Sequence, residues 1–409
     1  MIDRDLAASL RRLAGSFPVV TLTGPRQSGK TTLARHVFGD LPYVSLEDPG
    51  ELAFAQEDPK GFLARFAQGA VFDEAQRWPA LFSWLQGLVD ANRQPGRFIL
   101  TGSQQFGLMA GVTQSLAGRA AVLNLWPLSL GELGPKAAGD VDAMILRGGY
   151  PTLAVQPALA AQDWYASYVA TYLERDVRQV LRVQDLGSFQ RFVRLCAGRV
   201  GALLNLTALA NEAGIAQTTA RQWLTVLESS HLVLLLAPYH RNFGKRLVKM
   251  PKLYFVDTGL ACWLLGVRSA DQLVLHPQRG ALFENWVVTE FFKGRLNQGL
   301  PPDLWFWRDN NGLEADLLFE VATPQGQMMQ TVEIKSGRTV TPDTVRAGRR
   351  SGAFAGKEAL MPWLVHGGTD AYVRSGVRFI PWQGLAPVAS QRELLANQND
   401  PSMALPDRA

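Results

Sequence analysis

Short apolar runs alternate with helix-length segments over the first third of the chain. Runs of strand length lie at residues 17–23, 43–46, 70–72, 97–100 and 120–125. The segment 81–92, between two of these runs, has the length of a helix. Strands that alternate with helices predict a parallel sheet covered by helices on both faces. We therefore expect an α/β domain over residues 1–150.

After residue 150 the pattern becomes helical and then returns to strands. Trp164, Tyr168 and Tyr172 recur at helical spacing, and two short helices are expected within 206–223. Further strand runs lie at 253–256, 304–307, 314–321 and 329–334. We accordingly expect a helical linker with a second domain at 151–250, a third, α/β domain at 251–388, and a polar tail at 389–409.

Composition excludes several classes of protein. With 47% hydrophobic residues among 409, the chain is neither disordered nor fibrous. Its longest apolar runs, such as 232–237, are too short to span a membrane, and the mixed-charge start Met1–Asp5 is unlike a signal peptide. Two cysteines, Cys196 and Cys262, are too few for a disulfide framework. We expect a cytoplasmic protein with no membrane contact.

The net charge of +5 is unevenly distributed. Residues 1–150 carry fourteen basic and fourteen acidic side chains, whereas the segment from Glu174 to Met250 carries eleven basic and five acidic ones. Such a local excess suits a polyanion such as nucleic acid. A solvated helical surface is the other interpretation, and charge alone leaves both open.

A phosphate-binding loop is predicted where the first strand ends. The pattern Gly, four residues, Gly-Lys-Thr is met by Gly24, Pro25, Arg26, Gln27, Ser28, Gly29, Lys30 and Thr31, followed by Thr32 in the next helix. The glycines let backbone N–H groups point at phosphate oxygens, and the helix adds its positive end. Lys30 is expected to reach the β- and γ-phosphates of a nucleotide, and the Thr31 hydroxyl to bind Mg²⁺.

Two further strands end in polar residues that suit the same site. Asp73 is expected to hold Mg²⁺ through water, and Glu74 to orient or deprotonate the attacking water. The strand at 97–100 is followed by Thr101 and Ser103. One of these two hydroxyls is expected to sense the γ-phosphate or position water, unless the segment is an ordinary strand-to-helix turn.

In this order and spacing, the three motifs resemble those of AAA+-type ATPases. More narrowly, the chain resembles a large bacterial and archaeal family of ATP-binding proteins with a C-terminal domain of unknown function, through the stretches Gly24–Leu33, Asp73–Pro79, Leu100–Ser103 and Ser115–Arg119. The resemblance covers nearly the whole chain and implies Mg²⁺-dependent ATP hydrolysis in a homo-oligomer of unspecified size. It also makes Arg119 a candidate for stabilising charge on the chain's own nucleotide or on a neighbour's. Arg26, inside the loop, either shares this role or only pairs with a nearby acid.

A helix, a glycine turn and a second helix follow at 206–224, which is a helix-turn-helix arrangement. Ala220, Leu224 and Leu227 are expected to face the core, as is Trp223. The side chains left outward on the second helix, able to meet phosphates or base edges, are Thr218, Thr219, Arg221 and Gln222. With the strands and the basic loop 241–249 that follow, the pattern predicts a winged helix. DNA binding and protein docking both stay open for it.

The last domain carries acids and a lysine in a suggestive order. Glu284 lies in a predicted helix, Asp316 in a strand, and Glu333 and Lys335 two residues apart, hence on one face of another strand. This resembles restriction-endonuclease-like nucleases, in which acids hold Mg²⁺ beside the scissile phosphate and a lysine places water. Cleavage and binding without cleavage both stay open. Glu314 is either a further ligand or a solvent-facing neighbour.

Together these features predict an α/β AAA+ P-loop ATPase joined to a winged helix and a restriction-endonuclease-like domain. We expect ATP turnover to be coupled to the binding, remodelling or processing of DNA, such as branched DNA. Two alternatives are an ATP-controlled switch that docks a protein partner on an inactive nuclease-like scaffold, and an ATP-gated nuclease.

Overall fold

The fold is seen in a computed structural model that describes residues 2–103, 105–134, 139–173, 185–239, 249–309, 312–324, 326–339 and 341–390. Within this part of the chain, no helix is both long and apolar enough to cross a membrane. Cys196 and Cys262 are buried free thiols. Most of the basic loop expected as a wing, 241–248, lies outside the described residues, as do the arginines of 174–184 and the tail from 391 onward.

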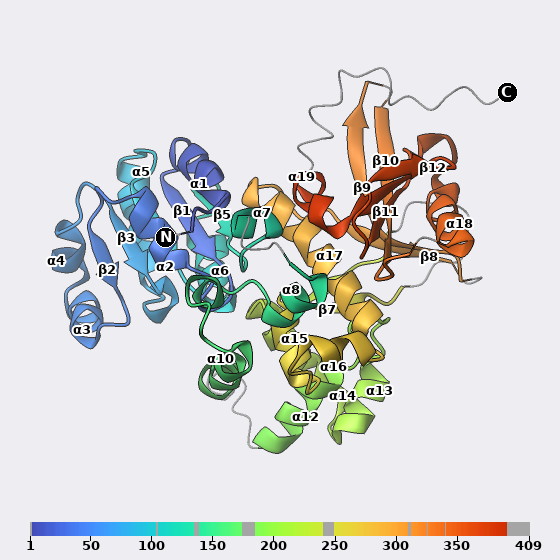
Figure 1. Ribbon diagram of the computed structural model, residues 1–409. Helices are drawn as coiled ribbons and strands as arrows, with labels where there is room; N and C mark the ends of the chain where they lie inside the picture. Colours follow the sequence, from blue (N-terminus) through green and yellow to red (C-terminus); the bar gives the residue numbers. More distant parts are fainter. Residues whose placement is uncertain are drawn as a thin grey trace.

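The first domain contains the predicted parallel sheet (Figure 1). Its strands, in the order β2-β3-β4-β1-β5, are β2 (Tyr43–Ser45), β3 (Ala70–Asp73), β4 (Phe98–Thr101), β1 (Val19–Thr23) and β5 (Ala120–Asn124). All four neighbouring pairs are parallel. The surrounding helices are α1 (Leu6–Ala14), α2 (Lys30–Val37), α3 (Pro49–Glu57), α4 (Pro59–Ala64), α5 (Leu81–Ala91) and α6 (Gln105–Ser115).

Helices cover both faces of this sheet. Alternate residues of a strand point to opposite sides, and the strands carry buried apolar side chains on both sides. Val71 packs in one cluster with α1 and α2, whereas its neighbour Phe72 packs in another with α4, α5 and α6. The carboxyl ends of the parallel strands therefore meet at one edge, between the two helical layers.

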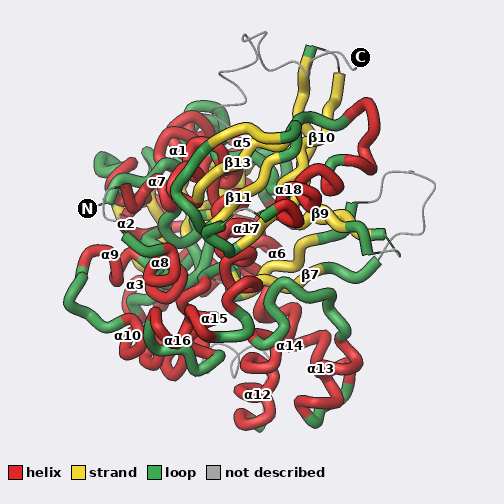
Figure 2. The backbone as a smooth tube through the Cα atoms, turned by 45° about the vertical axis from the view of Figure 1, so that its right-hand side comes forward, coloured by secondary structure: helices red, strands yellow, loops and turns green. Residues whose placement is uncertain are grey.

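The middle of the chain is mainly helical. It contains α7 (Leu130–Leu133), α8 (Val141–Arg147), α9 (Pro151–Val155), α10 (Ala161–Tyr168), a π-helical turn (Val169–Leu173), α12 (Leu186–Ala197), α13 (Leu206–Ala213) and α14 (Gln217–Ser229), then the antiparallel hairpin β6 (Val233–Leu236) and β7 (Lys252–Phe255). Gly214 ends α13 in the left-handed conformation, as the predicted glycine turn requires. Figure 2 shows α12, α13 and α14 grouped at one end of the molecule, away from β10 and β13.

The last part is a mixed sheet with a long helix on it. Its helices are α15 (Thr258–Leu264), α16 (Ala270–Leu275), α17 (Arg279–Asn297), α18 (Pro342–Ser351) and α19 (Leu385–Ala389). The six strands, in the order β12-β13-β11-β10-β9-β8, are β12 (Tyr372–Arg374), β13 (Val377–Pro381), β11 (Trp363–His366), β10 (Gly326–Lys335), β9 (Glu314–Thr323) and β8 (Trp305–Arg308). Strands β8, β9 and β10 are antiparallel neighbours, whereas β10, β11 and β13 run parallel.

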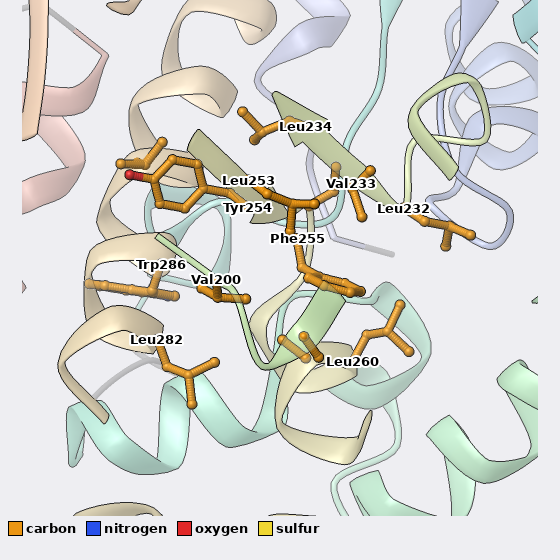
Figure 3. Packing of buried hydrophobic residues seen from close by; sticks show 14 of the residues in the cluster. Val200, Leu232, Val233, Leu234, Leu253, Tyr254, Phe255, Leu260, Leu282 and Trp286 are labelled. Atoms are coloured by element: carbon orange, nitrogen blue, oxygen red, sulfur yellow. The ribbon is translucent and has the colours of Figure 1, made fainter. Parts of the chain in front are cut away.

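A single hydrophobic core joins the middle and last parts, from Trp126 to Ala389. Figure 3 shows Leu253, Tyr254 and Phe255 of β7 beside the helices that carry Leu260 and Trp286. The expected boundary at residue 250 falls between the two strands of the β6–β7 hairpin.

Residue 389, expected to begin the polar tail, instead ends α19. Ala389 is buried there, and its carbonyl oxygen lies only 2.2 Å from where a Cβ would sit at Gly294. The small side chains allow α19 to pack closely on α17.

Candidate functional site

The predicted phosphate-binding loop connects β1 to α2. Gly24 (φ +143°) and Gly29 (φ +94°) both adopt conformations that L side chains rarely reach. A Cβ at Gly24 would lie 2.1 Å from the carbonyl oxygen of Leu125 on the adjacent chain segment. Glycine is therefore required at both positions, as the motif predicts.

Lys30 lies inside the loop at the first position of α2. Its Nζ donates hydrogen bonds to the carbonyl oxygens of Gly24 (3.0 Å) and Pro25 (2.8 Å). Burial lowers the pKa of Lys30 to about 8, although Glu74 and Asp73 oppose the shift. Ser28 Oγ is also buried and has no hydrogen-bond partner among the described residues. The loop therefore presents a buried ammonium and a spare hydroxyl, which suits an anionic ligand.

Asp73, at the end of β3, lies directly opposite the start of α2. The Thr31 hydroxyl donates to Asp73 Oδ2 (2.9 Å), and Tyr43 OH donates to the same oxygen (2.8 Å). Thr101 Oγ1 hydrogen-bonds Oδ1, the other carboxylate oxygen. Thr31 and Asp73 thus lie close enough to share one cation, and their hard oxygen donors fit Mg²⁺.

Glu74 follows in a left-handed conformation (φ +54°) that turns its side chain out of the strand. Its Oε2 accepts hydrogen bonds from Ser103 Oγ (3.2 Å) and from Gln76 Nε2. The sequence left open whether the hydroxyl of Thr101 or that of Ser103 serves the site. Both contact it, Thr101 at Asp73 and Ser103 at Glu74.

Sequence reasoning missed Tyr43 and Gln76 as members of this site. Gln76 stands two residues after Glu74, a local signal that was available. Tyr43 carried no such signal, because only the pairing of β2 with β3 brings it to Asp73.

A cavity of about 890 Å³ adjoins the loop. Arg26, Gln27 and Thr32 line it, together with the chain start at 2–11 and the segment 151–155, neither of which was predicted to contribute. The cavity is large enough for a nucleotide beyond its phosphates.

Arg4 connects this chain start to the loop. Its guanidinium donates to the carbonyl oxygens of Ser28 (2.7 Å) and Trp126 (2.6 Å) and pairs with Glu132 (2.9 Å). The Glu132 side chain is only 1% exposed, so this ion pair is buried.

Arg119 does not reach the chain's own loop. It immediately precedes β5, and β5 runs parallel to β1 with Ala120 opposite Val19. The loop follows the other end of β1, roughly 13 Å further along the strand. Arg119 instead pairs with Asp90 through two hydrogen bonds of 2.7 and 2.8 Å. Of the two roles left open for Arg119, the one on the chain's own nucleotide therefore has no contact to support it.

The second helix of the helix-turn-helix presents the predicted outward face. Thr218, Arg221 and Gln222 are exposed on α14, whereas Thr219 is half-buried. On the opposite side Trp223 packs edge-on against the rings of Phe189 and Phe192, with Ala220, Leu224 and Leu227 also buried.

The structure brings the four predicted residues of the last domain together. Lys335 Nζ lies 2.5 Å from Glu333 Oε1 and 4.0 Å from Asp316 Oδ2. Asp316 and Glu284 approach a common partner from β9 and α17. Burial, reinforced by Asp316, raises the pKa of Glu333 to about 7.

That common partner is Lys252, which sequence reasoning missed. Its Nζ lies 2.9 Å from Glu284, 2.5 Å from Glu314 and 3.8 Å from Asp316. Glu314, whose role was left open, is thus a partner of this lysine. The available signal was a single lysine in the apolar run of β7.

A metal does not fit this carboxylate cluster as it stands, because the Lys252 ammonium occupies the space between the acids. Across the described ranges, no group of three or more His, Cys, Asp or Glu side chains is placed to hold a metal ion.

Three successive segments of the chain each match a known protein family. Residues 16–134 match the family described as "AAA domain". Residues 138–271 and 279–385 match two families described as domains of unknown function, DUF8612 and DUF4143. The first part is therefore an AAA-type, nucleotide-binding P-loop domain.

Among solved structures, the chain is similar to the Walker-type ATPase PABY2304 of Pyrococcus abyssi (16% identity, 64% of this chain and 96% of that one, TM-score 0.44). It is also similar to the RuvB Holliday junction branch migration motor of Thermotoga maritima (20% identity, covering 56% of this chain and 86% of that one, TM-score 0.28). A third similar structure is the AMPPCP-bound DnaA of Aquifex aeolicus (13% identity, covering 55% of this chain and 85% of that one, TM-score 0.28).

Two mycobacterial relatives match over most of their length. Uncharacterized protein Rv2008c of Mycobacterium tuberculosis and uncharacterized protein Mb2031c of Mycobacterium bovis are each 37% identical over 356 residues. The match covers 85% of this chain and 76% of each relative. The chain therefore belongs to the same family as these two proteins, with an AAA domain followed by two domains of unknown function.

Proposed function

We propose that this protein is a Mg²⁺-dependent ATPase that couples ATP turnover to DNA handling. The observation that carries the proposal is the contact of Thr31 with Asp73 at 2.9 Å, beside a Glu74 held by Ser103. A magnesium-ligand pair and a candidate base thus lie next to the phosphate-binding loop, which is the arrangement that phosphoryl transfer to water requires.

Each residue has a distinct task in this proposal. Lys30 exchanges its two carbonyl partners for β- and γ-phosphate oxygens. Thr31 would hold Mg²⁺ directly and Asp73 would hold it through water, and the ion would supply positive charge beside the phosphates. Glu74 accepts the proton of the attacking water, and Ser103 orients the Glu74 carboxylate through its hydrogen bond.

Arg119 acts in trans in this proposal, within a homo-oligomer. The register of β5 removes it from its own loop, and its side chain lies near the surface, 23% exposed, beside Asp90. A neighbouring nucleotide would compete with Asp90 for the guanidinium. Mixing inactive Lys30→Ala and Arg119→Ala chains tests this, because shared sites would recover part of the turnover, whereas independent chains would recover none.

The DNA-binding element in this proposal is α14. Its exposed Thr218, Arg221 and Gln222 form a polar face beside a hairpin, with a local excess of basic residues in the surrounding sequence. This is the arrangement in which a recognition helix enters a major groove.

ATP turnover with Mg²⁺ tests the coupling most directly. It is measured without DNA and with single strands, duplex or a four-way junction, all at one moderate salt concentration because DNA binding depends on salt. Stimulation by one DNA form, lost in Lys30→Ala, supports the proposal. Equal turnover under all four conditions overturns the DNA coupling.

A second candidate is an ATP-controlled switch that docks a protein partner on an inactive nuclease-like scaffold. Lys252 favours it over an ATP-gated nuclease, because the carboxylates that would hold a catalytic metal are already paired with an ammonium group. Loss of DNA cleavage in Lys335→Ala would instead favour the nuclease.

A further inference from the structure

We infer that the Lys252 ammonium, rather than a divalent cation, is the resident counter-charge of the carboxylate cluster formed by Glu284, Glu314, Asp316 and Glu333. The cluster stands apart from the nucleotide site, so this inference is independent of the proposed ATPase activity. Its consequence is that Lys252 fixes the β6–β7 hairpin to the six-stranded sheet.

The position of Lys252 carries the argument. Its side chain is 4% exposed, and its Nζ reaches carboxylates on α17 and β9 (Glu284, Glu314 and Asp316) within 2.5–3.8 Å. An ammonium among three carboxylate oxygens from two elements has the contacts that a divalent cation would otherwise make. Within the described chain the lysine comes from β7, which pairs with β6 and with neither of these elements.

Neighbouring groups offset most of the remaining negative charge without a metal. Lys335 pairs with Glu333 (2.5 Å), and Arg308 approaches Glu314 (3.5 Å). Tyr254, two residues after Lys252 on the same face of β7, donates a hydrogen bond to Glu284 Oε1 (2.6 Å). Figure 3 shows Tyr254 extending from β7 toward the helix that carries Leu282 and Trp286, which is α17. Lys252 and Tyr254, two side chains of one strand, therefore both hydrogen-bond the carboxylate of Glu284.

Removing the lysine would leave the half-buried Glu284 and Glu314 and the buried Asp316 with too little positive charge. A buried ion pair that loses one partner is strongly destabilised, because the remaining charge stays desolvated. A divalent cation has the charge to replace the ammonium, and carboxylate oxygens are its preferred ligands. Lys252→Met keeps most of the apolar stem but ends one atom short and lacks the ammonium, so it should convert the cluster into a metal site.

The experiment measures thermal unfolding of the nucleotide-free full chain with and without Mn²⁺. Wild type should shift by less than about 1 °C with Mn²⁺. Lys252→Met should unfold roughly 5 °C lower or more, and about 1 mM Mn²⁺ should restore at least half of that loss. Isothermal titration should detect Mn²⁺ binding to Lys252→Met that is lost when Asp316→Asn is added, while Lys252→Arg should behave as wild type.

The measurement on the wild-type protein tests the inference even if Lys252→Met does not fold. Mn²⁺ binding to wild type that disappears in Asp316→Asn would overturn the inference, since the cluster would then hold a metal despite Lys252. Asparagine at 316 can still accept the hydrogen bond from the backbone N–H of Ile334 (2.8 Å), so this control preserves the strand contact. A folded Lys252→Met with unchanged Tm and no Mn²⁺ binding would overturn it as well.

Discussion

The guanidinium of Arg4 donates a 2.7 Å hydrogen bond to the carbonyl oxygen of Ser28 and so ties the start of the chain to the phosphate-binding loop. The same side chain bonds Trp126 and Glu132. Residues next to these are anchored to α17: Lys293 Nζ donates to Leu128 O (3.0 Å), and Glu290 accepts from the Leu130 N–H (2.7 Å). The loop and the long helix of the last domain are thus connected through one arginine.

Replacing Arg4 should weaken nucleotide binding more than it slows chemistry. Arg4→Ala removes two charge-assisted hydrogen bonds to backbone carbonyls, so the KM for ATP should rise roughly tenfold or more while kcat changes less. Steady-state turnover at several ATP concentrations measures both. Arg12→Ala, an exposed position on α1, the helix that begins two residues after Arg4, is the matched control. A pure fall in kcat would contradict a role in loop positioning.

Glu74→Gln should separate ATP binding from hydrolysis. The amide keeps the shape of the side chain but cannot accept the proton of water, so kcat should fall by about 10²–10⁴. Binding of a fluorescent ATP analogue should stay close to wild type. Glu47→Gln is the control, since Glu47 lines the same cavity but contacts neither Asp73 nor Glu74; its ion-pair partner is Arg77. Unchanged turnover in Glu74→Gln would reject Glu74 as the base.

Arg221→Ala should weaken DNA binding if α14 is the DNA-contacting helix. A phosphate contact predicts a salt dependence of log K that is shallower by about one, whereas a base contact predicts a loss of about 1–3 kcal/mol for one sequence over others. Fluorescence anisotropy over a salt series distinguishes the two. Arg349→Ala, on the exposed face of α18, makes the same change in net charge. Equal effects of the two substitutions would point to general electrostatics and against α14.

His231 should make the fold sensitive to acid. Burial, with a smaller effect of Lys30, lowers the pKa of His231 to about 3. Below pH 6.5 the unfolded chain takes up a proton that the folded chain refuses, so stability falls as pH decreases toward 3. Between pH 6.5 and 5 the loss should be roughly 2 kcal/mol.

Urea unfolding at several pH values measures this slope. His231→Asn should reduce it, and asparagine tolerates the left-handed backbone of this position (φ +53°). His36→Asn, at an exposed position, should leave the slope unchanged. An identical slope in wild type and His231→Asn would show that other groups cause the acid sensitivity.

The nucleotide site was readable from the sequence because its parts are local and follow a simple rule. Gly24 to Thr31 is one contiguous stretch of sequence, and Asp73 and Ser103 each follow a predicted strand. The carboxyl ends of parallel strands meet at one edge, so these residues could be expected to converge before their contacts were known. The outward face of α14 followed in the same way from helical periodicity.

Other features depended on tertiary structure. Arg4 and Lys252 act on residues far along the chain, and neither stands in a motif; their positions follow from how helices and hairpins pack. Strand register decided that Arg119 lies at the opposite end of the sheet from its own loop. Periodicity assigns a residue to one face of its helix or strand. Which other element packs against that face depends on the tertiary structure, and no local sequence pattern contains this information.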